Sequence, residues 1–342
     1  MKYEKNKVNA VYCCSDLFAE VCGVSAVSLF ENNKHLDEIN VFIIDDHMTD
    51  ANKGKILDIA GEYNRNVEFI PMPDPSEFYN DKRFTIKSLG HTYARMILGD
   101  ILPNSIERII SLDSDTLVLN KVDELWNTDM GAYNIAGVDD CMGRVALVKT
   151  QHLKEDAIHC NAGMYLINLS AWRAENWTGQ FKKYIVSLFD KNISLGGYEE
   201  EVITKVMGEK MMVLHPKFNL MTLEQVLTYD EVLRFRQPIK YYTETEIEEA
   251  KKNPVITHAV NFFYIRKRLY EKGSDHPMRA QYKKYRALTP WRNEPDMVVK
   301  QSPKQKFQKN FWHMMPRQLA IKVGNYVRNE IRPKLEKKRD DE

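Results

Sequence analysis

The sequence predicts an α/β protein built on a mixed, mostly parallel sheet with helices on both faces. Strand-like apolar runs alternate with segments of helical spacing through the first two-thirds of the 342 residues, a rhythm typical of parallel sheets. Aspartates collect where several of these runs stop, and ligands of such sheets bind beyond the carboxyl ends of the strands. The content of 43% hydrophobic and 28% charged residues is that of a soluble globular chain with a sizeable core.

The individual elements follow from apolar runs and their periodicity. Short apolar runs predict strands at 8–14, 39–44, 67–70, 108–119, 135–138, 164–167 and 255–259. Helical spacing predicts helices at 18–32, 50–63, 87–102, 169–176, 180–189 and 199–207. The last of these opens with three glutamates, which suit the positive end of a helix dipole. A further helix is expected after Pro316.

The most informative segment is RIISLDSDTLVL, residues 108–119, which carries Asp113 and Asp115. In an extended chain these two side chains share a face. Two adjacent carboxylates repel each other unless a cation lies between them, and a hard divalent ion such as Mn²⁺ or Mg²⁺ suits that position. The alternative is an ordinary acidic turn at the end of a strand.

Charge and cysteine content narrow the class of protein. The net charge of +1 argues against bulk nucleic-acid binding, but residues 300–342 hold 12 Lys/Arg against 5 Asp/Glu, so a mildly acidic body carries a basic tail. The five cysteines show no C-x-x-C spacing and predict buried reduced thiols in a reducing compartment, the cytoplasm. We find neither a signal-peptide pattern nor an apolar run of membrane-spanning length in the sequence.

A change of character near residue 262 suggests a main domain at 1–262 and a helical basic extension at 263–342. In the extension, one helical stripe collects Leu319, Val323, Tyr326, Val327 and Ile331, and the opposite face carries Lys322, Arg328 and Arg332. Such a helix fits peripheral attachment to an anionic membrane surface. The alternatives are packing of this helix against the body and a dimer contact.

Several segments together resemble glycosyltransferase family 8, which includes glycogenin and bacterial galactosyl- and glucosyltransferases of lipopolysaccharide synthesis. They are VNAVYCCSDLFAEVCGVSAVSLFENN (8–33), GHTYARMILGDILP (90–103), SLDSDTLVLNKVDELWNTDM (111–130), CNAGMYLINLSAWR (160–173) and HPKFNLM (215–221). The resemblance covers about residues 8–262. It implies a GT-A (Rossmann-like) fold and transfer of a hexose, glucose or galactose, from a UDP-sugar with retention of configuration.

The resemblance also implies a metal centre. Asp113, Asp115 and His258 would hold Mn²⁺, or Mg²⁺, against the diphosphate of the donor, where the ion acts as Lewis acid and template. For His258 alone, the alternative is a core histidine near the end of a strand.

By the same resemblance, other residues would bind the donor. Arg95 would contact a phosphate or sugar oxygen, with a surface salt bridge as the alternative. Asn161, Ala162 and Gly163 would form the floor under the sugar, with a tight turn as the alternative. The full predicted donor-binding set is Tyr12, Cys13, Asp16, Arg95, Asp113, Ser114, Asn161, Ala162, Gly163 and Asn261.

Two departures from the family pattern concern catalysis. Where many members have Asp-Gln-Asp, this chain has Glu199, Glu200 and Glu201. We expect Glu199 to bind a sugar hydroxyl and Glu200 to act as nucleophile or as stabiliser of positive charge, while an acid-rich helix start is the alternative. The family's Lys-Pro-Trp after the histidine is missing, and one of the cations at 266–268 could bind diphosphate instead.

The sequence therefore predicts a Mn²⁺-dependent retaining hexosyltransferase that acts on a glycan, lipopolysaccharide or other surface-glycan acceptor. We expect it in the cytoplasm and, through residues 300–342, on the inner face of the cell membrane. Two alternatives stay open: a nucleotide-sugar phosphohydrolase, which would need no acceptor, and a degenerate protein that binds UDP-sugar without turnover.

Overall fold

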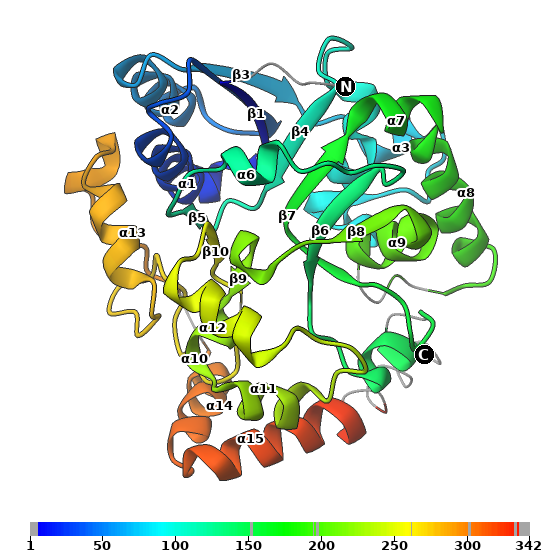
Figure 1. The fold of residues 1–342 in the computed structure, drawn as a ribbon, viewed down its shortest axis with the longest axis vertical. Helices are drawn as coiled ribbons and strands as arrows, with labels where there is room; N and C mark the ends of the chain where they lie inside the picture. The colour runs from blue at the N-terminus through cyan, green and yellow to red at the C-terminus, as the bar shows by residue number, and fades with distance from the viewer. Residues whose placement is uncertain are drawn as a thin grey trace.

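A seven-stranded sheet forms the centre of the protein, as the sequence predicts (Figure 1). The computed structural model describes residues 6–150, 153–193, 195, 198–260, 262–299, 302–331 and 334. The strand order is β3-β2-β1-β4-β7-β6-β8. Their bounds are β1 (Lys7–Ser15), β2 (Glu38–Asp46), β3 (Asn66–Pro71), β4 (Arg108–Leu112), β6 (Ile135–Asp139), β7 (Cys160–Asn168) and β8 (Met211–Val213).

Strand β7 is antiparallel to both of its neighbours, β4 and β6, whereas the other pairs in this sheet are parallel. The reversal brings the amino end of β7 to the edge of the sheet where β1, β2, β4 and β6 have their carboxyl ends. The start of β7 therefore faces the ligand edge expected for such sheets.

Helices cover both faces of the sheet, so its central strands are buried on two sides. One face packs against α1 (Ala19–Asn32), α2 (Asp50–Glu62) and α13 (Arg279–Arg286). The other packs against α5 (Leu98–Ile101), α7 (Leu169–Ala174), α8 (Trp177–Phe189) and α9 (Tyr198–Met207). In β1, Ala10 and Tyr12 enter the first core while Val11 between them enters the second.

The predicted helix at 87–102 is wrong as a single element. The chain forms α4 (Ile86–Leu89), a 3₁₀ helix at His91–Ile97 and then α5. The break falls at Gly90, whose φ of +80° and ψ of 163° favour a residue without a Cβ atom. Every residue from Tyr93 to Ile97 is buried, and the tighter turn places Arg95 beneath the edge of the sheet.

The predicted strand at 108–119 is also two elements. Strand β4 belongs to the large sheet, and β5 (Thr116–Val118) belongs to a small sheet of order β5-β10-β9 with β9 (Leu220–Met221) and β10 (Ile256–His258). Between them the main-chain oxygen of Asp113 accepts hydrogen bonds from the Thr116 amide at 3.1 Å and hydroxyl at 2.8 Å. Asp113 and Asp115 therefore converge through a turn and not through extended alternation.

The remaining helices surround both sheets. They are α3 (Pro75–Phe78), α6 (Asp123–Trp126), α10 (Thr222–Val226), α11 (Tyr229–Arg236), α12 (Glu244–Lys252), α14 (Pro303–His313) and α15 (Arg317–Tyr326), with a π-helical turn at Val327–Ile331. Helix α3 lies on the α8 side of the large sheet. None of the helices in the described ranges is long and apolar enough to cross a membrane.

Helix α15 packs against α11 through a face that differs from the predicted apolar stripe. Ala320, Ile321 and Gly324 are buried, and a Cβ added at Gly324 would lie 3.0 Å from the Phe235 ring. Leu319, Tyr326 and Ile331, three members of the stripe, stay exposed. Small residues let α15 approach the body closely while part of the stripe faces outward. Arg332 lies outside the described residues.

Candidate active site

A cavity of about 890 Å³ opens at the edge of the large sheet where β1, β2, β4 and β6 end and β7 begins. Eight of its lining residues carry the argument that follows: Cys13, Asp113, Ser114, Asp115, Asn161, Glu200, His258 and Arg268. A pocket of this size is large enough for a sugar nucleotide.

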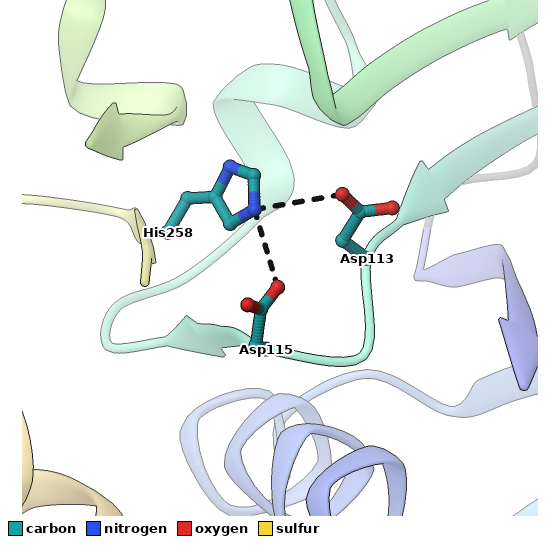
Figure 2. A group of neighbouring side chains, drawn as sticks. All are labelled: Asp113, Asp115 and His258. Atoms are coloured by element: carbon teal, nitrogen blue, oxygen red, sulfur yellow. Dashed lines mark ion pairs between the residues drawn. The ribbon is translucent and has the colours of Figure 1, made fainter. Parts of the chain in front are cut away.

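One corner of the cavity brings together three side chains that could hold a divalent metal, and we call it the metal corner. The turn after β4 supplies Asp113 and Asp115, and the last residue of β10 supplies His258 (Figure 2). One ligand atom from each side chain lies within 4.8 Å of the others. The His258 Nε2 atom is 3.2 Å from Asp115 Oδ1 and 3.5 Å from Asp113 Oδ2. Two carboxylates and an imidazole form a donor set that fits Mn²⁺ or Mg²⁺.

Asn161 and Gly163 hold the imidazole of His258 from behind. The Asn161 Oδ1 atom accepts a hydrogen bond from the Gly163 amide at 3.0 Å and lies 2.9 Å from His258 Nδ1. Because this oxygen is an acceptor, Nδ1 carries the proton, which leaves Nε2 directed at the aspartates. A Cβ added at Gly163 would lie 2.0 Å from Nδ1, so only glycine permits this approach.

Charge in the metal corner is balanced by the protein itself. Burial opposes both charges, but the hydrogen bond and ion pair between Asp115 and His258 raise the pKa of His258 and lower the pKa of Asp115. Arg268 adds a second cation, because its Nη1 is 2.9 Å from Asp115 Oδ2. A bound metal would replace positive charge that His258 and Arg268 now supply.

Arg268 is the one of the three cations at 266–268 that reaches this cavity. Arg266 pairs with Asp275 at 3.0 Å, and Lys267 donates to the carbonyl oxygen of Lys272 at 2.5 Å. The spacing in the sequence could not distinguish these residues, since it does not show which side chain turns inward.

Arg95 lies one layer below the cavity and is only 1% exposed. Its Nη1 donates to Glu199 Oε1 at 2.5 Å, and its Nη2 donates to Asp113 Oδ1. Burial opposes its charge, but Asp113 and then Glu199 keep the pKa of Arg95 above its ordinary value. In this structure Arg95 fixes Asp113 and Glu199, and its direct contact with a donor stays a prediction.

The three consecutive glutamates at the start of α9 have different surroundings. Glu199 contacts Arg95, Glu201 accepts from the Tyr184 hydroxyl at 3.1 Å, and Glu200 lines the cavity. The Ala162 amide donates to Glu200 Oε1 at 2.8 Å. Burial and then the charge of Asp140 raise the pKa of Glu200 well above its usual range. Glu200 therefore directs a carboxyl group into the cavity next to Asn161.

The remaining predicted donor-binding residues are only partly brought together. Cys13 and Ser114 line the cavity, and the Ser114 hydroxyl donates to the Cys13 carbonyl oxygen at 3.4 Å. Tyr12 is buried in the core, where its hydroxyl meets Ser25 Oγ at 3.1 Å. The carboxylate of Asp16 accepts from the amide and hydroxyl of Thr49, both at 2.8 Å. Asn261 lies outside the described residues.

Other lining residues were not predicted as site residues. Asp46 ends β2 and Asp140 follows β6, so the strand-end pattern could have identified both. Arg236 lines the cavity from the last residue of α11. Its sequence neighbourhood reads as an ordinary amphipathic helix and contains no signal of a site.

The fold and this cavity define a glycosyltransferase of the GT-A class. The chain belongs to glycosyl transferase family 8, whose pattern matches residues 9–260. It is 23% identical over 295 residues to general stress protein A of Bacillus subtilis (strain 168), a match that covers 86% of this chain and 98% of that protein.

Solved structures show the same fold at low sequence identity. The galactosyltransferase LgtC, in complex with donor and acceptor sugar analogues, has a TM-score of 0.64 at 17% identity over 88% of this chain and 100% of that chain. The bifunctional glycosyltransferase WbbM has a TM-score of 0.67 at 17% identity and matches 86% of this chain, which spans 52% of the WbbM chain.

Proposed function

We propose that the protein transfers a hexose, glucose or galactose, from a UDP-sugar to a hydroxyl group of a surface glycan or glycolipid, with retention of configuration and with Mn²⁺ or Mg²⁺ bound. The observation that carries this proposal is the group of Asp113, Asp115 and His258 in one cavity with Glu200. The family membership supports glycosyl transfer as the reaction class.

When bound, the metal would neutralise charge on the departing diphosphate and orient it. The bond between the sugar C1 and the phosphate oxygen breaks, and UDP leaves with the electron pair. A new bond forms between C1 and the acceptor oxygen. In retaining transfer the acceptor arrives on the face that UDP leaves, so the departing phosphate oxygen is the nearest base for the hydroxyl proton.

Glu200 would stabilise positive charge at C1 as the bond breaks. The Ala162 amide at 2.8 Å and the Asn161 amide nitrogen at 3.4 Å hold its Oε1 atom. Burial makes a carboxylate costly at this position, so its charge is best compensated when the neighbouring sugar carbon becomes cationic. Glu200→Gln removes the charge and keeps the shape. Turnover as fast as in the unchanged protein would exclude an essential nucleophile here.

A panel of UDP-sugars with Mn²⁺ tests the reaction, with UDP release scored in the presence and absence of saccharide acceptors. A transferase releases UDP faster with an acceptor, a phosphohydrolase cleaves the donor without one, and a degenerate protein binds UDP without turnover.

Asp113→Asn with Asp115→Asn should abolish metal-dependent UDP binding. Asp58→Asn, an exposed change on α2, is the matched control. Equal calorimetric affinity for UDP with and without Mn²⁺ would contradict the metal assignment.

The exposed apolar side chains of α14 and α15 support a second part of the proposal, peripheral attachment to an anionic membrane. Phe307, Phe311, Met314, Leu319 and Tyr326 all stay exposed, and we call them the C-terminal apolar face. The basic tail lies in the same part of the sequence. An amphipathic surface with nearby Lys and Arg suits insertion at the level of the lipid headgroups.

A further inference from the structure

The edge of the large sheet orders the charged groups of the cavity. The strand order β4-β7-β6 places Asp113 after β4, Asn161 on β7 and Asp140 after β6. Asn161 connects the metal corner to Glu200, because its side chain contacts both His258 and Glu200. Asp140 thus follows β6, the strand on the side of β7 opposite to β4, which leads to Asp113 of the metal corner.

Arg236 belongs to the end of the cavity next to β6. The loop after β6 runs beside the end of α11, where Gly143 forms an isolated bridge with Pro238 and a Cβ at Gly143 would lie 2.1 Å from the Arg236 carbonyl oxygen. Burial lowers the pKa of His159 to about 4; Asp140 opposes this shift and Arg236 reinforces it, so both charges lie near His159. The Nε2 atom of His159 is 3.9 Å from Glu200 Oε2.

The guanidinium of Arg236 has no hydrogen-bonded or ion-paired partner among the described residues; its charge acts on the buried carboxyl of Glu224 only from farther away, where it opposes the rise in the pKa of Glu224 that burial causes. No described residue accepts a hydrogen bond from the guanidinium or places a carboxylate oxygen within 4.0 Å of it, and its Nε atom is buried without a partner. It stacks near the Phe235 ring, with 5.8 Å from the guanidinium carbon to the ring centroid. Several other arginines with buried atoms do have carboxylate partners, among them Arg95, Arg268, Arg286 and Arg317, and Arg65 and Arg108 donate to backbone carbonyl oxygens.

A partly buried cation without a partner is costly unless a ligand supplies the opposite charge. We propose that Arg236 binds a negatively charged substituent, a phosphate or a carboxylate, on the acceptor saccharide. A guanidinium matches either group with two parallel hydrogen bonds. This inference rests on the proposed transfer reaction and adds the acceptor class: the substrate is anionic and not a neutral sugar.

The order of the groups along the edge of the sheet assigns the anion to the acceptor and not to the donor. The metal corner takes the donor diphosphate, and the sugar carbon lies at Glu200, so the next position belongs to the incoming molecule. Arg328, on the turn after α15, lines the same cavity. A neutral acceptor would leave Arg236 without a hydrogen-bonded counter-charge, which gives selectivity against it.

The test uses the full chain saturated with UDP and Mn²⁺, into which glucose 6-phosphate and glucose are titrated by calorimetry. We expect the phosphate ester to bind about tenfold more tightly or better, as a charged hydrogen-bonded pair provides. Arg236→Gln should remove that preference, and Arg236→Lys should restore part of it. Arg234→Gln, an exposed change on the same helix, should keep it.

UDP affinity in Arg236→Gln reports on folding and on the donor end, and it should stay unchanged. Equal affinity of the unchanged protein for the two sugars would overturn the anionic subsite while leaving the transfer reaction intact. Failure of the unchanged protein to bind UDP with Mn²⁺ would overturn both. In a parallel experiment, the affinities for UDP-glucuronate and UDP-glucose are compared. If Arg236→Gln weakens binding of UDP-glucuronate alone, Arg236 contacts an anionic group of the donor, and the assignment to the acceptor is refuted.

Discussion

Gly163 determines how closely β7 can approach the imidazole of His258. A Cβ at this position would lie 2.0 Å from Nδ1 and 2.4 Å from Cε1, distances that the ring can escape only by moving. We therefore expect Gly163→Ala to shift Nε2 away from the aspartates and to weaken Mn²⁺ binding by about tenfold or more, as changes behind metal ligands do. Calorimetric titration of Mn²⁺ measures this effect.

Gly54→Ala is the control for Gly163→Ala. A Cβ at Gly54 on α2 meets nothing within 4 Å, and alanine favours a helix over glycine by about 0.5–1 kcal/mol. It should leave Mn²⁺ affinity unchanged and slightly raise the free energy of unfolding. Unaltered Mn²⁺ affinity in both variants would contradict the role given to Gly163.

Glu224 makes stability depend on pH. It is 3% exposed, and burial raises its pKa to about 7 from an ordinary 4.5. Between these values the unfolded chain releases the proton first, so the free energy of unfolding falls as pH rises through this window. At about 1.4 kcal/mol per pKa unit the loss is about 3 kcal/mol above pH 7.

Glu224→Gln keeps an acceptor for the Tyr241 hydroxyl, which donates to Glu224 at 3.0 Å, and cannot ionise. Urea unfolding at pH 5 and pH 8 should show a smaller loss of stability in the variant than in the unchanged protein. Parallel pH dependence of the two proteins would contradict the assignment.

The three side chains of the candidate metal site could be predicted from the sequence, whereas the groups around them could not. Asp113, Asp115 and His258 stand in a characteristic order and context along the chain. The buried contacts of Arg95 and the inward direction of Arg268 depend on how distant segments pack. Arg236 could not be predicted either, because the sequence of its helix is that of an ordinary amphipathic helix.

At the scale of elements, alternation of strand and helix patterns predicted six of the seven strands of the large sheet, because each of these is a local apolar run. It missed the short edge strand β8, which has three residues. The direction of β7 and the small sheet were not predictable in this way. Strands β5, β9 and β10 are three, two and three residues long, and their pairing joins segments far apart in the chain. Pairing of that kind leaves little signal in local sequence.

The break between α4 and the 3₁₀ helix requires glycine. Gly90 has a φ of +80° with ψ of 163°, a region that other residues occupy at a cost of about 1–3 kcal/mol. We expect Gly90→Ala to lower the free energy of unfolding by that amount in chemical denaturation. Gly61→Ala, where a Cβ meets nothing within 4 Å, should not be destabilising. Equal stability of the two variants would show that the break tolerates a side chain.

At the scale of the whole molecule, the C-terminal apolar face can be tested without disturbing the core. Deleting the tail would expose the surface under α15, so point changes are preferable. We expect Phe307→Ser with Met314→Ser and Tyr326→Ser to reduce co-sedimentation with anionic vesicles several-fold, because these side chains would insert into the interface.

Leu57→Ser, an exposed apolar change on α2, is the control and should leave vesicle binding intact. Raised salt should weaken binding of the unchanged protein, since each basic residue near an anionic surface contributes about 1 kcal/mol. Undiminished co-sedimentation of the triple variant would refute this mode of attachment.

The position of His258 on β10 also affects how the chain is made. Asp113 and Asp115 emerge from the ribosome well before His258, and the small sheet joins β5 to β10 only after that later segment has been synthesised. A nascent chain that ends before β10 therefore holds two of the three ligands and cannot form the complete metal corner. Because an ion that binds only the folded state stabilises it by mass action, the ion would favour full-length chains over truncated ones.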